Sequence, residues 1–239
     1  MIGDKRVLCI IPVRGGSKGV ANKSARPLAG RPLMAYTVDD ALACPEIDRT
    51  IVSTDDENLA RIAREAGIDV PFMRPAELAG DTVSTIDVLV HAMEQVAAEE
   101  GPYDLVVLLH ATAPFRAPED VTACLRLVAE EGAENAFSVS EAHRNPYFNL
   151  VELAADGTVH LSKQGTYTRR QDTPPVYDLN AAVYVWPWET LLQKRAVILP
   201  GSRIHVMPPD RSIDIDTDLD FRMAECLIAS GGYAVSKPL

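Results

Sequence analysis

The feature that most constrains the fold is the stretch from Val7 to Arg31, in which an apolar run passes directly into a basic, glycine-rich loop. The run over residues 7–11 is short, continuous and rich in β-branched side chains, which is typical of a parallel strand buried on both faces. Pro12 lacks an N–H group and therefore ends the hydrogen-bonded ladder. A basic glycine loop directly after such a strand is a common way for α/β proteins to bind phosphate.

The loop combines a permissive backbone with positive charge. Three glycines let the chain turn and let its amide groups approach an anion closely: Gly15, Gly16 and Gly19. Residues 1–31 hold seven Lys and Arg but one acidic residue, although the whole chain has a net charge of −11. The spacing matches neither the dinucleotide-binding G-x-G-x-x-G motif nor the P-loop. The sequence therefore predicts a phosphate site of another kind; the alternative is a glycine turn with solvated charges.

Strand-like and helix-like segments alternate up to Gly132, which predicts an α/β fold with a doubly wound, mostly parallel sheet in three layers. After the first strand, further strands are expected at residues 47–53, 68–73 and 104–109. In such sheets, ligands bind beyond the carboxyl ends of the strands. The glycine loop, residues 53–55 and residues 110–116 are therefore expected to line one crevice.

The pattern changes in residues 140–180, which are polar and rich in turns. Asp156-Gly157 separates two short β-like runs and predicts a hairpin. We interpret this region as a small β-rich arm or lid inserted into a single domain that spans the chain. The adjacent Arg169 and Arg170 suit a carboxylate ligand, and the alternative is a solvated loop.

Near the C-terminus, five aspartates fall within residues 210–220, and like charges gathered so closely favour a bound cation. In an extended Asp-Ile-Asp segment the two carboxylates point the same way, so Asp214 and Asp216 are predicted to hold Mg²⁺ together with phosphate oxygens and water. Asp218 and Asp220 are interpreted as first-turn residues of the last helix. A basic loop with an aspartate pair suggests a nucleoside triphosphate–Mg²⁺ complex that is attacked at its α-phosphorus and releases pyrophosphate.

Length and composition limit the domain organisation, the partners and the compartment of the protein. The length of 239 residues suits one large α/β domain, and a pI near 4.9 argues against nonspecific binding to nucleic acid. Four widely separated cysteines in apolar contexts are typical of free thiols in a reducing compartment: Cys9, Cys44, Cys124 and Cys226. No apolar stretch approaches the length of a membrane span. We expect a cytoplasmic protein without nucleic-acid or membrane partners.

Six motifs occur in order over nearly the whole chain: IPVRGGSKG at residues 11–19, RPAELA at 74–79, LLHATAPFR at 108–116, RQD at 170–172, NAAVY at 180–184 and SIDIDT at 212–217. Together they resemble the motifs of the acylneuraminate cytidylyltransferases, the CMP-sialic acid synthetases. The first and last motifs in combination are highly specific, whereas either alone is weak.

The resemblance implies that CTP and a nine-carbon α-keto sugar acid give the CMP-sugar and pyrophosphate. By analogy, the catalytic residues are Arg14, Lys18, Asp214 and Asp216, the last two being Mg²⁺ ligands. The implied nucleotide ligands are Arg14, Gly15, Gly16, Ser17, Lys18, Lys23, Arg74 and Ser84. The implied sugar ligands are His110, Arg170, Gln171, Asn180 and Tyr184. The resemblance also implies a homodimer in which the arm reaches into the partner's site.

The chain departs from the family pattern at His110, where Gln is frequent, at Ser24, where Asn is frequent, and in residues 145–149, which lack a frequent Lys. These departures cluster where the sugar is expected, so they concern its identity more than the reaction. Residues 145–149 and 177–180 look closer to relatives that use legionaminic-type sugars. Two alternatives to this reading are a glycosyltransferase with an Asp-x-Asp metal site and a non-catalytic nucleotide-binding module.

Overall fold

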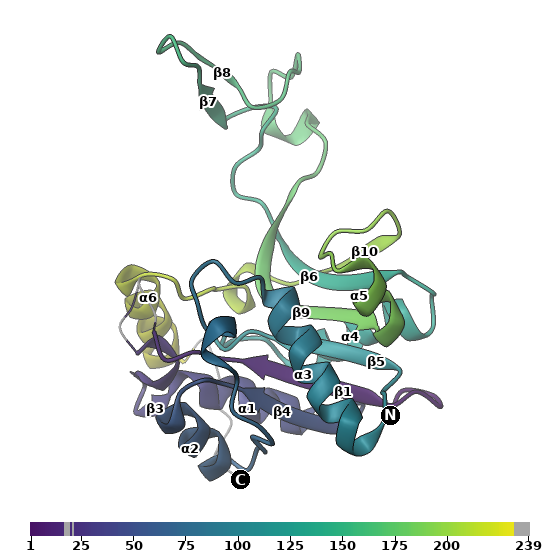
Figure 1. The fold of residues 1–239 in the computed structure, drawn as a ribbon. Coiled ribbons are helices and arrows are strands. Elements are labelled where there is room, and N and C mark those ends of the chain that lie inside the picture. The colour runs from purple at the N-terminus through teal and green to yellow at the C-terminus, as the bar shows by residue number, and fades with distance from the viewer. Residues whose placement is uncertain (17–19, 21, 232–239) are drawn as a thin grey trace.

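The computed structural model describes residues 1–16, 20 and 22–231, and a six-stranded sheet forms its centre (Figure 1). The strands lie in the order β10-β6-β9-β5-β1-β4. Their bounds are β1 Val7–Pro12, β4 Arg49–Ser53, β5 Leu105–Leu109, β6 Asn135–Glu141, β9 Tyr177–Pro187 and β10 Ser202–Val206. Strand β9 runs antiparallel to both of its neighbours, and the other pairs are parallel. The predicted mostly parallel α/β sheet is confirmed.

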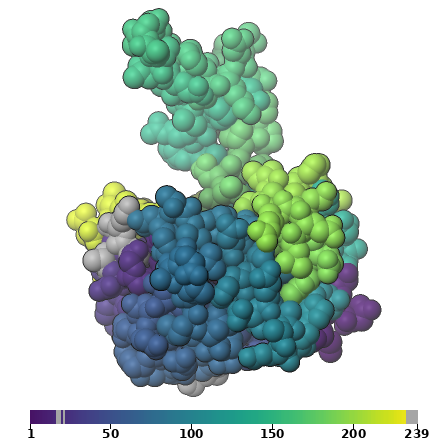
Figure 2. Space-filling model, viewed as in Figure 1, coloured from purple at the N-terminus to yellow at the C-terminus, as the bar shows by residue number. Residues whose placement is uncertain are grey.

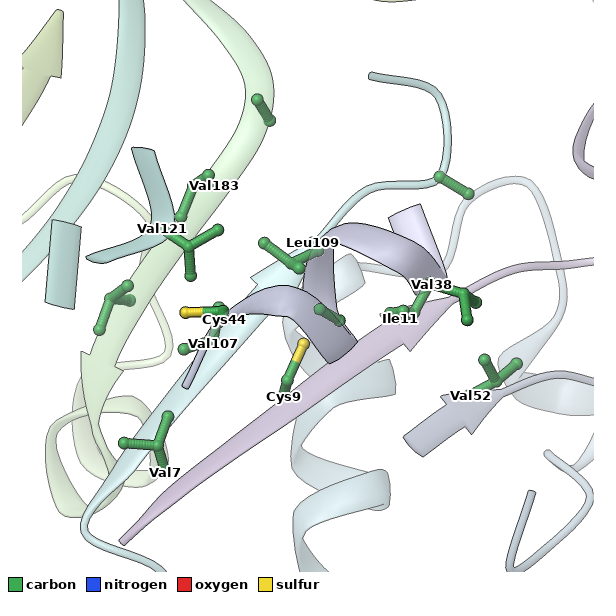
Figure 3. Packing of buried hydrophobic residues seen from close by; sticks show 14 of the residues in the cluster. Val7, Cys9, Ile11, Val38, Cys44, Val52, Val107, Leu109, Val121 and Val183 are labelled. Carbon is green, nitrogen blue, oxygen red and sulfur yellow. The ribbon is translucent and has the colours of Figure 1, made fainter. Parts of the chain in front are cut away.

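Both faces of the sheet are buried, as strand β1 illustrates. Val7, Cys9 and Ile11 enter one apolar core (Figure 3), whereas Leu8 and Ile10 enter the core on the other face. Helices α1, α2 and α4 cover the first core, and helices α3 and α5 cover the second. Their bounds are α1 Leu33–Ala43, α2 Glu57–Glu65, α3 Thr85–Glu100, α4 Pro118–Ala129 and α5 Trp188–Lys194. Burial on both faces explains the continuous apolar run and confirms the three predicted layers.

A third apolar cluster joins the last helix, α6 (Asp218–Ala229), to α1 and to β2 (Pro27–Leu28), which pairs with β3 (Arg31–Pro32). Ile215 is fully buried in this cluster, which fixes the segment between the two predicted metal ligands. Asp220 accepts a hydrogen bond from Thr217 N (2.7 Å) in a capping box at the start of α6. The prediction that Asp218 and Asp220 begin the last helix is confirmed.

Several short 3₁₀ helices complete the described chain: η1 Lys23–Ala25, η2 Ala76–Leu78, η3 Arg170–Asp172 and η4 Pro209–Arg211. Each connects longer elements or belongs to a loop that leads to the carboxyl edge of the sheet or to the arm described below. Within the described ranges, no helix combines the length and the apolar character that crossing a bilayer requires.

The segment between β6 and β9, residues 142–176, forms a projection that we call the arm (Figure 2). The chain leaves the sheet at Glu141 and returns at Tyr177, and these two residues are paired. Because no crossover helix separates the two strands, they pair antiparallel, as neighbouring strands joined on the same side must. Strands β7 (Val151–Leu153) and β8 (Val159–Leu161) form the predicted hairpin of the arm.

The predicted strand at residues 68–73 is wrong. This segment forms isolated bridges with the edge strand β4, at Ile51 with Asp69, and with the residue that follows it, at Thr54 with Met73. Pro71 lies between the two bridges and has no N–H group to donate, so a continuous ladder does not form.

Candidate active site

A cleft of about 480 Å³ lies beyond the carboxyl ends of β1 and β5. Its charged and polar wall comes from four separate parts of the chain. Arg14 and Lys23 follow β1, and Arg74 lies between β4 and α3. His110 and Thr112 follow β5, and Asp216 precedes α6. Two of the three segments predicted to share one crevice therefore line it directly. The third supplies Asp55, which accepts hydrogen bonds from two residues of the wall or next to it, as described below.

Arg14 spans one side of the cleft. Its guanidinium forms an ion pair with Asp81 (NH2 to Oδ1, 2.8 Å) and donates to the carbonyl oxygen of Ala79 (3.5 Å). Asp81 also lines the cleft, on the loop that precedes α3. The guanidinium is half-exposed, so a phosphate entering the cleft would compete with Asp81 for it.

The glycine loop packs against the start of α2. A Cβ at Gly15 would lie 2.5 Å from Asp56 Oδ2, and Asp56 caps α2 by accepting from Leu59 N (2.9 Å). Gly15 N donates to Asp55 Oδ1 (3.4 Å), which also accepts from Arg74 NH2 (3.3 Å). A larger residue at position 15 would therefore have to displace the capping carboxylate of Asp56, and Asp55 joins this loop to Arg74.

Arg74 is buried, and its NH2 also donates to the carbonyl oxygen of Val13 (2.5 Å). This bond and the bond to Asp55 hold the side chain along the wall of the cleft. A buried cation held in this way is preorganised for an anionic ligand, because little side-chain entropy is lost on binding.

Lys23 links the basic loop to the aspartates near the C-terminus. Its ammonium donates to Asp216 Oδ1 (2.9 Å) and to the carbonyl oxygen of Ile215 (2.7 Å). The lysine is largely buried, whereas Asp216 is exposed to the cleft. The two predicted halves of the triphosphate site, one cationic and one anionic, therefore meet within a single chain.

Asp214 is the more buried member of the predicted metal pair. Burial raises the pKa of its carboxyl group, the hydrogen bond with Thr112 lowers it, and the nearby Asp216 raises it further. Among the described residues, Asp214 Oδ1 is buried without a hydrogen-bond partner. An orphaned carboxylate oxygen beside a second carboxylate is a fitting position for a hard cation. No group of three His, Cys, Asp or Glu side chains gathers in the described ranges, so such a cation would need further ligands from substrate or water.

His110 sits beside the aspartates, and its ring meets the ring of Tyr184 edge-on with 5.8 Å between centroids. Burial, together with the positive charges of Arg116 and Lys23, lowers the pKa of His110 to about 4. The imidazole is therefore neutral at neutral pH and adds a hydrogen-bonding group but no charge. Tyr184 is buried and stacks on Trp186, and its ring contact with His110 places it next to the cleft.

Two predicted ligands serve the fold in this structure. Ser84 caps α3 by accepting from Ile86 N (3.1 Å). Asn180 is 3% exposed, and its amide group donates to Ser212 Oγ (3.0 Å). The predictions that Ser84 contacts the nucleotide and Asn180 the sugar gain no support from this geometry.

Arg170 and Gln171 lie on the arm and line a separate cleft of about 640 Å³. Arg170 donates to the carbonyl oxygen of Ala142 (2.8 Å), whereas Arg169 forms a bidentate pair with Asp172 (2.8 and 3.0 Å). Arg170 is absent from the wall of the first cleft, so one chain does not bring the predicted sugar ligands of the arm to the nucleotide site.

The remaining predicted phosphate ligands divide into two groups. Gly16 lies exposed in the loop after β1. Ser17 and Lys18 lie outside the described residues, so their predicted contacts stay predictions.

Sequence reasoning missed Asp81, and it gave no individual role to Asp55 or Thr112, although both lie in segments that were expected to line the crevice. Asp55 had a local signal, since it follows strand β4 directly. Asp81 had none, because its partner Arg14 is far away in the chain. Thr112 acts partly through its backbone, whose carbonyl oxygen accepts from Ile215 N (2.8 Å), and backbone contacts leave no trace in side-chain patterns.

Comparisons with known proteins agree with this geometry. The sequence profile of the family described as Cytidylyltransferase matches residues 8–225. The chain is 36% identical over 225 residues to post-translational flagellin modification protein B of Campylobacter coli, covering 93% of this chain and 94% of that protein. It is 34% identical over 226 residues to the CMP-N,N'-diacetyllegionaminic acid synthase of Campylobacter jejuni, covering 93% and 95%.

A solved structure of a CMP:2-keto-3-deoxy-manno-octonic acid synthetase complexed with CTP shares the fold, with a TM-score of 0.71 and 17% identity over 95% of this chain and 99% of that one. The profile match covers most of the chain and favours nucleotidyl transfer over both alternatives, glycosyl transfer and binding without catalysis. The chain therefore belongs to the cytidylyltransferase family and is a nucleotidyltransferase enzyme.

Proposed function

We propose that this cytidylyltransferase joins CMP from CTP to a nine-carbon α-keto sugar acid of the legionaminic type. The anomeric hydroxyl of the sugar attacks the α-phosphorus of CTP, the hydroxyl proton is lost, and the bond to the β-phosphate breaks to release pyrophosphate. Relatives named for CMP-N,N'-diacetyllegionaminic acid, pseudaminic acid and N-acylneuraminate support this substrate class. The chain's own residues position the reactants and offset charge, which is the main task in phosphoryl transfer.

The observation that carries this proposal is the contact of Lys23 with Asp216 across the nucleotide cleft, at 2.9 Å. It joins cations that suit phosphates to carboxylates that suit a metal ion, in one cleft that Arg14 and Arg74 also line. A triphosphate with its metal ion contains the same two complementary charges. When it binds, phosphate oxygens would replace Asp216 beside Lys23, and the carboxylate would turn to the cation.

Asp214 and Asp216 are the residues that would hold Mg²⁺. The buried, unpartnered Oδ1 of Asp214 and the exposed carboxylate of Asp216 supply two of the oxygen ligands that Mg²⁺ prefers. Bound there, the ion would neutralise negative charge on the phosphates as pyrophosphate leaves. The other ligands would be phosphate oxygens and water, because Mg²⁺ usually takes one or two protein carboxylates and completes its shell in this way.

We also propose a homodimer in which the arm completes the sugar site of a second copy. Side chains on the arm hairpin are unusually exposed for apolar residues, including Leu153 at 74% and Val159 at 65%. Exposed apolar clusters of this kind commonly mark protein interfaces. A second copy seated on the arm would bury them and could bring Arg170 toward the other chain's nucleotide cleft, where a sugar carboxylate would need it.

We place the enzyme in the cytoplasm. All four cysteines are free, and three of them are buried in the cores, which suits a reducing compartment. CTP is an intracellular metabolite, so the proposed reaction also has to take place inside the cell.

The experiment is a pyrophosphate-release assay with the full chain, Mg²⁺, CTP and one sugar acid at a time. N,N'-diacetyllegionaminic, pseudaminic and N-acetylneuraminic acids test the nine-carbon class, and 2-keto-3-deoxy-manno-octonic acid is the eight-carbon control. We expect release with CTP and the legionaminic acid, and little when UTP or ATP replaces CTP. Release with the eight-carbon acid alone would overturn the sugar class, and no release with any acid would overturn the reaction.

A further inference from the structure

A buried carboxylate outside the cleft is bonded to the segment that carries the proposed metal ligands. Asp120, in the first turn of α4, is 1% exposed. Its Oδ2 accepts from Ala117 N (2.9 Å) and so caps the helix, while its Oδ1 accepts from Arg211 NH2 (2.8 Å) and His205 Nε2 (2.9 Å). Although burial raises the pKa of Asp120, these hydrogen bonds and the charge of Arg211 hold it below its ordinary value. The group is therefore a charged anchor and not a neutral acid.

Arg211 is the last residue of η4, three positions before Asp214. Between Met207 and Thr217 the chain has no helix or strand other than this single 3₁₀ turn. Its course is set by a few side-chain and backbone bonds, so each of these bonds has a large share in placing the carboxylates. The Asp120–Arg211 bond ties the segment to α4, a long helix of the main body.

The other bonds of the segment include one before the aspartates and one between them. Asn180 donates to Ser212 Oγ (3.0 Å), and Ile215 N donates to the carbonyl oxygen of Thr112 (2.8 Å). Lys23 also donates to the carbonyl oxygen of Ile215 (2.7 Å) and to Asp216 (2.9 Å), and Met207 N donates to the carbonyl oxygen of Val139 (2.8 Å) at the upstream end. Arg211 adds a link to α4 between that end and Asp214. Removing Arg211 takes a charged partner from the buried Asp120 and removes the link between the segment and α4, so the segment loses one of the bonds that fix its position upstream of Asp214.

We propose that Asp120 and Arg211 are positioning residues for the metal site: through their ion pair they hold Asp214 and Asp216 in the arrangement that binds the cation. This inference rests on the proposed Mg²⁺ site. Neither residue lines the nucleotide cleft. Their action resembles that of partners behind metal ligands in general, whose loss typically lowers metal affinity by about 10- to 100-fold.

The test measures Mn²⁺ binding to the full chain in the presence of CTP, by electron paramagnetic resonance of the unbound ion, so that the readout does not depend on turnover. Arg211→Gln should raise the apparent Kd for Mn²⁺ by about 10-fold or more, while CTP binding without metal stays as in the wild type. Arg211→Lys keeps the positive charge and should recover part of the affinity. The double variant with Asp120→Asn should be no worse than the worse single variant, because the two residues act as one pair.

The matched control is His205→Gln. It removes a partner from the same carboxylate oxygen, but His205 lies in β10 and not in the metal segment. It should lower the Tm and leave Mn²⁺ affinity unchanged. If Arg211→Gln and His205→Gln lower the Tm alike and neither changes Mn²⁺ affinity, the pair is merely structural and the inference is overturned. If Asp216→Asn binds Mn²⁺ as the wild type does, the metal site itself is overturned, and the inference with it.

Discussion

The nucleotide cleft and the arm differ in how their side chains find partners. In the cleft, Arg14 and Lys23 are each paired with a carboxylate from a distant part of the same chain. On the arm, the hairpin has strands of three residues, and the apolar side chains of Leu153 and Val159 face outward. A β-hairpin of this size is at best marginally stable alone, whereas the residues of the cleft are held by a sheet with a buried apolar core on each face.

This difference indicates that one chain can form the nucleotide site by itself, whereas the arm needs a second copy to complete a site. The cleft contains opposite charges in balance, which a triphosphate and its cation can replace group by group. The arm carries apolar surface and a guanidinium, Arg170, that lie away from the cleft. We therefore expect changes in the cleft to affect the nucleotide within each chain, and changes in the arm to act through a second copy.

The largest expected effect comes from Asp216→Asn in the cleft. Removing the carboxylate charge weakens both the cation site and the contact with Lys23, so kcat for pyrophosphate release should fall by on the order of 10²- to 10³-fold. The measurement is pyrophosphate release over a series of Mg²⁺ concentrations. Asp218→Asn is the control, because Asp218 begins α6 and pairs with Arg26 (2.5 Å). If Asp216→Asn turns over as fast as the wild type, Asp216 is not a metal ligand.

The next effect tests the arm. Arg170→Ala should raise the KM for the sugar acid by roughly 10- to 100-fold, as expected when a charged hydrogen bond of about 1.5–3 kcal/mol is lost, with the KM for CTP unchanged. Arg169→Ala is the matched control, because Arg169 is already paired with Asp172. An equal loss in the use of CTP would move Arg170 to the nucleotide and erase the distinction between the two regions.

Association of two chains is tested on the same hairpin. Leu153→Asp should raise the dimer Kd by roughly 10- to 100-fold, since burying a leucine contributes about 1.5–3 kcal/mol. Sedimentation equilibrium measures this constant. Leu42→Asp alters an exposed leucine of α1 in the main body and should leave association unchanged. A wild-type chain that stays monomeric at all concentrations would contradict the proposed dimer.

A smaller effect should appear in the pH dependence of stability. The pKa of His110 is about 4 in the folded chain, against an ordinary value of 6.5. Between these values the unfolded chain binds a proton that the folded chain does not, so the free energy of unfolding should fall as the pH falls from 6.5 toward 4. In His110→Gln this loss should be shallower, as measured by denaturant unfolding across that range. His160→Gln on the exposed hairpin should follow the wild type.

The smallest effect is expected at Ser84. Ser84→Ala removes the cap of α3 and should lower the free energy of unfolding by about 1 kcal/mol, whereas Ser84→Asn keeps a capping oxygen and should restore it. Chemical denaturation measures the change. If the KM for CTP also rises in the alanine variant and not in the asparagine variant, the hydroxyl's cap orders the edge of the cleft. A rise in both variants would favour the predicted direct contact with the nucleotide.

Local patterns predicted much of the fold because their physics is local. The apolar run of β1, the turn at Asp156-Gly157 and the acids that begin α6 each act within a few residues, and all were found where expected. The segment at residues 68–73 looked equally strand-like. It failed because Pro71 interrupts pairing with a neighbour that the sequence does not identify.

What the sequence by itself determined is a phosphate-binding strand and loop at one end of the chain, a paired-aspartate segment at the other, and the family to which both belong. Only the tertiary structure decided that Lys23 and Asp216, 193 positions apart, touch in one cleft, and that Arg170 does not join them there. It also decided that Asn180 is an interior support and that Asp120 anchors the metal segment. The physical reason is that charged and buried polar groups interact with the groups nearest to them in space. The packing of the sheet and its helices sets these distances.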